Sequence, residues 1–137
     1  MIDWFNSSFD ARLTDWKNFR EQIENESIEE KLKQTALFFS NTPYCNRSID
    51  YYTPSTWPDP WELINSKIHC LSSISLMMYY TLKFVNVEVN LLLIDDGRDE
   101  YVVPYHSDTD SLLNYDFGII EKLSDLNDIK IVDKIQF

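Results

Sequence analysis

The chain has 137 residues, of which 44% are hydrophobic and 15% are aromatic, with only two glycines. This length and composition predict one hydrophobic core, and therefore one domain spanning residues 1–137. The 23 acidic and 12 basic residues give a formal charge of -11. This charge repels nucleic-acid phosphates and anionic lipid heads, so it argues against a conventional role on either.

The sequence also lacks the features that direct a chain into or across a membrane. No segment approaches the ~18 consecutive apolar residues of a span, and residues 1–9 lack the basic charge and apolar run of a signal peptide. We therefore expect a protein made in the cytoplasm. In that compartment Cys45 and Cys70 should stay reduced, and two cysteines with two histidines at these spacings do not make a zinc site.

The first 40 residues predict a pair of helices. Apolar residues recur three or four positions apart from Leu13 to Ile23, which is the pattern of an amphipathic helix. Ser27 and Glu30 then form a capping-box pattern, in which each side chain satisfies a free amide of the helix start. The second helical face follows and extends to Phe39.

Residues 41–60 predict an ordered loop rich in proline and tyrosine. They contain four of the five prolines, with aromatic residues between them, so a regular helix is excluded. Asp59 then begins a short helix, because Pro60 suits the first helical position and Glu62 lies three residues after the cap. This helix should end near Asn65.

Residues 60–135 therefore predict a helix, a second helix and then strands. The run 70–84 has few charges and no helix breaker, which predicts a central, buried helix headed by Cys70. Residues 87–94 and 100–105 predict a β-hairpin closed by the turn at 95–98.

Two further strands are expected, at residues 112–115 and 129–135, with a turn or helical piece at 117–126 between them. The predicted fold class is thus α+β. The N-terminal helices and the central Cys-headed helix pack on a small, mostly antiparallel sheet.

Cys70 is the residue that hints at chemistry. A cysteine at a helix start gains thiolate character from the free backbone amides and the helix dipole. Nucleophilic catalysis also needs a base within hydrogen-bond reach, with a third group that orients it. His69 directly precedes Cys70, and neighbouring residues at a helix start point apart, which leaves His106.

The order of these elements resembles a known family. A Pro-Trp-Glu-Leu-Ile helix, a cysteine ten residues after its proline, and a strand, turn and second strand are similar to the core of the transglutaminase-like branch of the papain-like cysteine fold. The resemblance spans about Pro58 to Asp116. It implies a nucleophile at Cys70 and an orienting acid, which Asp116 matches.

The same resemblance implies a histidine near the start of the strand at 100–105. That position falls on or beside Tyr101 and Val102, neither of which acts as a base at neutral pH. His106 lies four to five residues further along, and strand alternation places it on the face opposite Tyr101. The implied triad is therefore incomplete.

Other side chains are candidates for binding instead of catalysis. The Pro58–Trp61 stretch is preformed by its prolines, and exposed aromatics are common interface anchors. The candidate binding residues are Trp57, Pro58, Trp61 and Tyr101. Asp108 and Asp110 lack the ligand spacing and the closing glutamate of a calcium loop, so we expect no metal.

Three functions remain open. The first is a noncatalytic binding or structural subunit whose partners are other protein subunits, with no cofactor, metal, nucleic acid or membrane. The Trp57–Ile64 region and the helix after it also resemble small proteins of large tailed bacteriophages, which implies a virion or assembly protein.

The second is a cysteine-dependent amide hydrolase or acyltransferase. In it Cys70 attacks a carboxamide, His106 serves as base and then acid, and Asp116 or Asp108 orients the ring. The third is an acidic DNA mimic, which would need carboxylates arranged in two rows like duplex phosphates.

Overall fold

The computed structural model describes residues 1–45 and 49–137, so residues 46–48 of the expected loop lie outside the described part of the chain. Its elements follow the predicted order except for one additional strand within residues 117–126. The helical elements are α1 (Phe9–Ile23), α2 (Ile28–Phe38), η1 (Pro54–Thr56), α3 (Pro60–Asn65), α4 (Leu71–Phe84) and η2 (Leu123–Asp125). The strands are β1 (Asn90–Asp95), β2 (Glu100–His106), β3 (Ser111–Asp116), β4 (Ile119–Lys122) and β5 (Lys130–Ile135).

The five strands form one antiparallel sheet in the order β4-β3-β2-β1-β5. The predicted hairpin is its centre: Leu93 lies opposite Val102, and Asp95 lies opposite Glu100 at the turn. The last strand, β5, returns to pair with β1. The α+β fold class predicted from the sequence is therefore confirmed.

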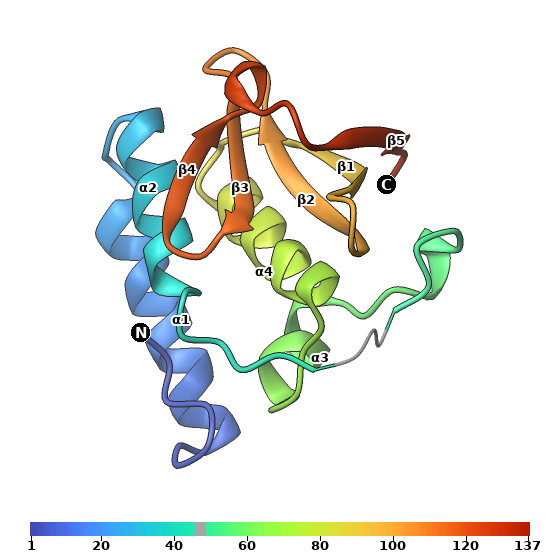
Figure 1. Ribbon diagram of the computed structural model, residues 1–137. Helices are drawn as coiled ribbons and strands as arrows, with labels where there is room; N and C mark the ends of the chain where they lie inside the picture. Colours follow the sequence, from blue (N-terminus) through green and yellow to red (C-terminus); the bar gives the residue numbers. More distant parts are fainter. Residues whose placement is uncertain (46–48) are drawn as a thin grey trace.

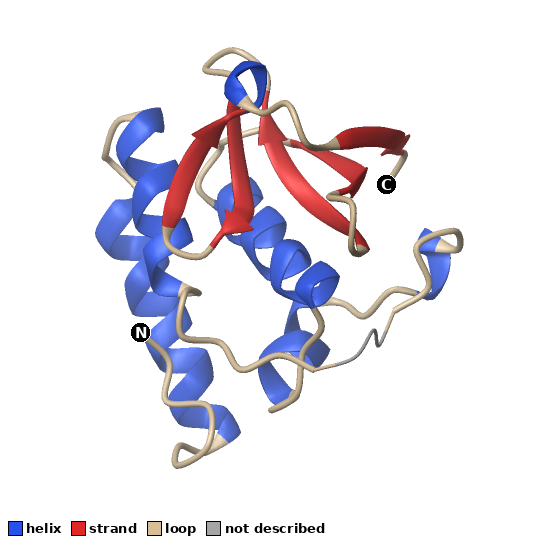
Figure 2. Ribbon diagram, viewed as in Figure 1, coloured by secondary structure: helices blue, strands red, loops and turns tan. Residues whose placement is uncertain are grey.

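Helix α4 packs against one face of the sheet, mainly across β2 and β3. Figures 1 and 2 show α1 and α2 side by side at the flank of this layer, with α3 below the start of α4. Burial is nearly complete along α4, where Ile74, Leu76 and Leu82 are 0% exposed. Apolar residues cover so much of its surface because helices and sheet enclose it on several sides.

The opposite face of the sheet carries a second, smaller apolar cluster. Its buried members are Leu92, Ile94, Tyr101, Val103 and Leu112. Alternation along β1 and β2 divides these residues from Leu93 and Val102, which pack on the α4 side. Leu123 and Leu126, from η2 and the residue after it, pack against this outer cluster.

Two local expectations differ from the structure. The turn or helical piece expected at 117–126 contains a strand, β4, because Gly118 adopts φ +75° and lets the chain reverse and pair with β3. At the start of α2, Ser27 Oγ accepts from the Glu30 N–H at 3.1 Å, but the Glu30 carboxylate accepts from Gln34. A reciprocal capping box does form at the start of α3, between Asp59 and Glu62.

The helices of the described residues are too short or too polar to cross a membrane.

Candidate functional site

Cys70 is the residue that caps the start of α4. Its sulfur accepts from the Ser73 N–H at 3.4 Å, and its own N–H donates to Ser73 Oγ at 2.9 Å. The pair therefore forms a reciprocal capping box in which sulfur takes the place of the usual oxygen. Cys70 is 3% exposed, so its thiol is buried at the helix start.

His69 is oriented by the same turn. Its Nε2 lies 3.1 Å from the Ser66 carbonyl oxygen, and its Nδ1 lies 3.3 Å from Ser73 Oγ. Because a carbonyl only accepts, this network assigns the proton to Nε2. Burial of the imidazole lowers the pKa of His69 to about 4, and the hydrogen bond to Ser66 only partly opposes this shift. The ring is neutral at pH 7, with Nε2–H bonded to Ser66 and Nδ1 beside Ser73 Oγ, whose hydroxyl donates to the Cys70 carbonyl at 3.0 Å.

Two strands of the sheet contact the first turn of α4. The main-chain N–H of Val102 donates to Ser72 Oγ at 2.9 Å, which ties β2 to the helix start. From β3, Asn114 Nδ2 donates to the Leu71 carbonyl at 2.9 Å and to Ser75 Oγ at 2.8 Å. Val102 and Asn114 are 0% and 3% exposed, so an alkyl group and an amide fill this junction.

The sequence pattern selected Asp116 on β3, whereas the residue that reaches α4 is Asn114. Asp116 is exposed at the end of the strand. Asn114 adopts φ +61°, and the β3–β4 register shifts between Leu112 and Asp116. This irregularity lets Leu113 and Asn114 both turn toward α4, which regular alternation forbids. Asparagine's tolerance of this conformation was the only available signal.

His106 lies at the other end of α4. It shares a pocket with Tyr79, Lys83 and Asn86, which follow Cys70 by nine or more residues. At a rise of ~1.5 Å per residue, this places the ring on the order of 15–20 Å from Cys70 along the helix. Its Nδ1 is bonded to Thr109 Oγ1 at 2.7 Å. The structure therefore does not bring Cys70, His106 and Asp116 together.

The four candidate binding residues are spread over different environments. Trp61 is 50% exposed and packs edge-on against Trp16. Trp57 is buried beneath the Phe137 ring, and Pro58 is half-buried. Tyr101 is buried in the outer cluster of the sheet, where burial and the neighbouring Asp96 raise its pKa.

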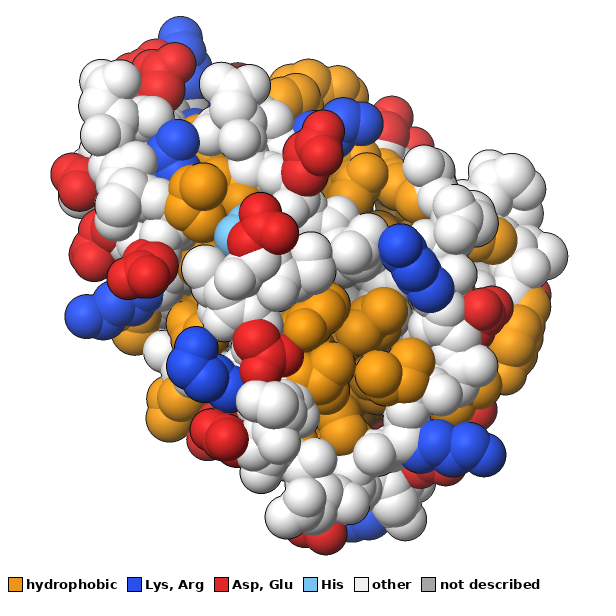
Figure 3. Space-filling model, turned by 90° about the horizontal axis from the view of Figure 1, so that it is seen from above, with side chains coloured by type: hydrophobic (Ala, Val, Ile, Leu, Met, Phe, Trp, Pro, Cys, Tyr) orange, Lys and Arg blue, Asp and Glu red, His pale blue; other side chains and the backbone are white. Residues whose placement is uncertain are grey.

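The charged side chains give no ordered pattern on the face seen in Figure 3. Acidic and basic groups are interspersed there around a central group of hydrophobic side chains, and the acidic groups do not form two parallel rows. Among the described residues there is also no cluster of three or more histidine, cysteine or acidic side chains that could hold a metal ion.

Comparison with known proteins identifies the fold. No family model matches the sequence, and no curated protein matches it. Solved structures of LapG from Legionella pneumophila align with 96% of this chain and 76% to 78% of their own chains, at TM-scores of 0.76 to 0.78 and 18% to 19% identity. They include a calcium-bound and an EGTA-treated form. The fold is transglutaminase-like.

This likeness agrees with the family resemblance of residues 58–116 and extends it over nearly the whole chain. It places Cys70 at the head of the central helix of a transglutaminase-like scaffold. It gives no support to a bacteriophage origin.

Proposed function

We propose that this chain is a noncatalytic binding or structural subunit built on a transglutaminase-like scaffold. The observation that carries the proposal is the junction at the start of α4. There β2 contributes Val102, a side chain without a proton-accepting group, and β3 contributes Asn114, whose amide is bonded to the helix. Acid–base catalysis that used β2 or β3 at this junction would need a titratable side chain there.

The two histidines of the sequence support the same proposal. His69 is a weak base, because burial holds its pKa at about 4, and its Nε2–H is bonded to the Ser66 carbonyl. His106 lies beside the far end of α4. Cys70 itself caps the helix from a buried position, which is the role of a structural side chain.

In this proposal the partner is another protein subunit, and Trp61 is one exposed aromatic contact for it. The finer assignment, a phage virion or assembly protein, has only the sequence likeness of residues 57–64 behind it. We retain it as part of the proposal because a scaffold whose helix-start cysteine is a buried cap suits assembly. The proposed subunit needs no cofactor or metal.

The second candidate is a cysteine-dependent amide hydrolase or acyltransferase. Two observations favour it: Cys70 heads the buried central helix of a fold shared with LapG, and a pocket of about 530 Å³ beside it is lined by His69 and Ser73. In this candidate His106 acts as base and Asp116 orients it, so both must approach Cys70 from other elements.

Turnover assays on matched variants distinguish the two candidates. Purified wild-type chain and Cys70→Ser are incubated with casein and a fluorescent primary amine, and both peptide release and amine incorporation are measured. We expect the two proteins to give the same background signal. A product that forms only with Cys70 present, and that is lost again in His106→Asn, would overturn the binding role and establish the enzyme.

A further inference from the structure

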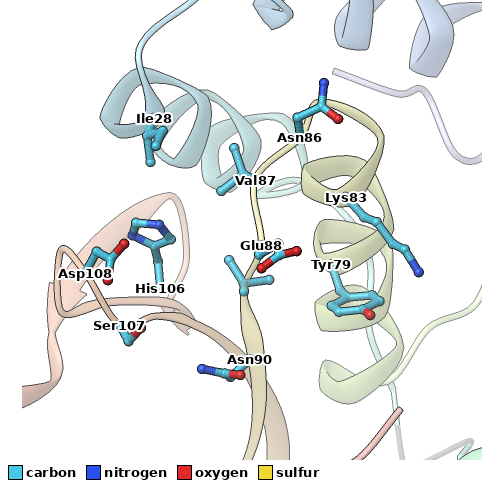
Figure 4. A pocket seen from close by; sticks show the side chains of 11 residues that line it. Ile28, Tyr79, Lys83, Asn86, Val87, Glu88, Asn90, His106, Ser107 and Asp108 are labelled. Carbon is cyan, nitrogen blue, oxygen red and sulfur yellow. The ribbon is translucent and has the colours of Figure 1, made fainter.

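A second, larger pocket of about 840 Å³ lies at the far end of α4 from Cys70. It is bounded by the end of α4, the segment 86–90 that leads into β1, the start of α2 and the turn after β2 (Figure 4). Its volume falls within the range of small-ligand sites. Nothing in the proposed binding role uses this pocket, so its residues need an explanation of their own.

His106 is held in the wall of this pocket by a relay of hydroxyl groups. The ring is 6% exposed, its Nδ1 lies 2.7 Å from Thr109 Oγ1, and that oxygen lies 2.7 Å from Ser111 Oγ. Ser111 also donates to the Thr109 carbonyl at 3.3 Å. With the Ser111 hydroxyl donating to that carbonyl, the Thr109 hydroxyl can donate to Ser111 Oγ and accept from His106 Nδ1–H, which is the proton order that the proposal uses.

This proton order leaves Nε2 of His106 as an acceptor. Among the described residues no hydrogen bond to His106 Nε2 is formed, whereas Nδ1 is bonded to Thr109. Nε2 is therefore the ring nitrogen that can bind a ligand. Figure 4 shows the Asp108 carboxylate beside the ring. Asp108 is exposed and His106 is buried, so the wall presents a carboxylate next to the Nε2 lone pair. Both groups accept hydrogen bonds, and the ligand they suit is a cationic donor.

The apolar residues near this wall restrict the shape of the ligand. Ile28 from α2 and Val87 line the same pocket, and Figure 4 shows them on the side of His106. Tyr79, Glu88 and Lys83 lie toward α4. Hydrogen-bond acceptors beside an apolar surface suit a long alkylammonium, because its alkyl stem can pack on the apolar residues while its ammonium head contacts the acceptors.

The charge of the pocket and of the chain agree with a cation. Glu88 adds a second carboxylate to the lining, whereas the Lys83 ammonium lies 5.9 Å from the Tyr79 ring centroid, on the α4 side. The net charge of -11 also raises the local concentration of cations. We propose that this pocket binds an alkylammonium group, held by His106 Nε2 and the Asp108 carboxylate with its stem on Ile28 and Val87.

Two sources supply that chemistry: a lysine side chain of a protein and a free aliphatic diamine. The probes are N-acetyl-lysine methylamide for the first and 1,5-diaminopentane for the second, with N-acetyl-norleucine methylamide as the uncharged control. Binding is measured by calorimetric titration and by amide shift changes in NMR, up to about 10 mM, where a millimolar Kd is still resolved.

We expect saturable binding of at least one amine, with shifts confined to residues lining the pocket, and at least tenfold weaker binding of the norleucine probe. Asp108→Asn, at an exposed position that does not endanger folding, should weaken amine binding about tenfold or more. Asp125→Asn removes an exposed carboxylate outside the pocket and should leave the Kd unchanged. Thr109→Val, which releases the ring, should weaken binding while the variant melts cooperatively.

Three results would overturn the proposal: no saturable binding of either amine, equal binding of the norleucine probe, or equal losses in Asp108→Asn and Asp125→Asn. The last would mean that the amine only screens the acidic surface. Repeating the titration with Cys70→Ser separates this proposal from the proposed function, because the pocket should bind unchanged whether or not Cys70 proves catalytic.

Discussion

Replacing Asn114 tests the junction on which the functional proposal rests. The buried Asn114 amide donates to the Leu71 carbonyl and to Ser75 Oγ, and its backbone adopts φ +61°. Each buried hydrogen bond contributes about 0.5–1.5 kcal/mol. The left-handed conformation costs a residue with a β-carbon about 1–2 kcal/mol, a cost that asparagine bears better than most. Asn114→Ala should therefore lower the free energy of unfolding by about 2–4 kcal/mol.

Asn114→Gly separates the two causes. Glycine loses the same hydrogen bonds but adopts positive φ without strain, so it should be about 1 kcal/mol more stable than the alanine variant. The loss of Asn114 Oδ1, a buried atom that has no hydrogen-bond partner among the described residues, offsets part of the cost in both variants.

The measurement is urea unfolding followed by tryptophan fluorescence, with the free energy extrapolated linearly to water. Asn127→Ala, at an exposed position outside the helices and strands, is the control and should change stability by less than about 0.5 kcal/mol. The reasoning is refuted if Asn114→Ala behaves like this control, or if alanine is at least as stable as glycine at position 114.

Two further predictions concern buried polar groups. The pKa of His69 is about 4 in the folded state against 6.5 in the unfolded state, so the free energy of unfolding should fall by up to about 3 kcal/mol as the pH drops from 6.5 to 4. In urea unfolding across this range, the free energy of unfolding of His69→Gln should depend less on pH than that of the wild type. The same pH dependence in both proteins would contradict the lowered pKa of His69. Thr81→Val removes the acceptor of the Trp16 indole N–H at 2.9 Å and should cost about 1–3 kcal/mol. Thr35→Val removes a buried hydroxyl that has no partner in the described chain, so this variant should be as stable as the wild type or more stable in thermal melts. If Thr81→Val and Thr35→Val lose the same stability, the assigned role of the Trp16–Thr81 hydrogen bond is refuted.

Much of the fold follows from local signals in the sequence. The Asp59 cap with Pro60, the uncharged run after Cys70 and the turn at 95–98 each determine an element through nearby residues, and the structure has all three. Strand β4 was missed because its half-exposed residues carry neither alternation nor a continuous apolar run. Only the reversal at Gly118 and pairing with β3 make it a strand.

The candidate site was harder to predict because it depends on contacts between distant elements. The position of Cys70 at the head of α4 is a local property and follows from the sequence. The contact of Asn114 with Leu71 joins residues 43 positions apart and depends on an irregularity of β3, for which asparagine's tolerance of positive φ is the only signal in the sequence. Likewise, the sequence shows that His106 ends a strand, but only the packing of β2 on α4 places it far from Cys70.

The central proposal is that Cys70 serves as a buried helix cap and not as a nucleophile. The most direct test is the rate at which iodoacetamide alkylates Cys70 in a Cys45→Ser chain, compared with the rate for exposed Cys45 in a Cys70→Ser chain, both measured by mass spectrometry under native conditions. We predict that Cys70 reacts at least about 100-fold more slowly than Cys45. Because Cys70 should react only when the structure opens, its rate should rise in sub-denaturing urea. Rapid alkylation of Cys70 at neutral pH, slowed by His106→Asn, would contradict the account.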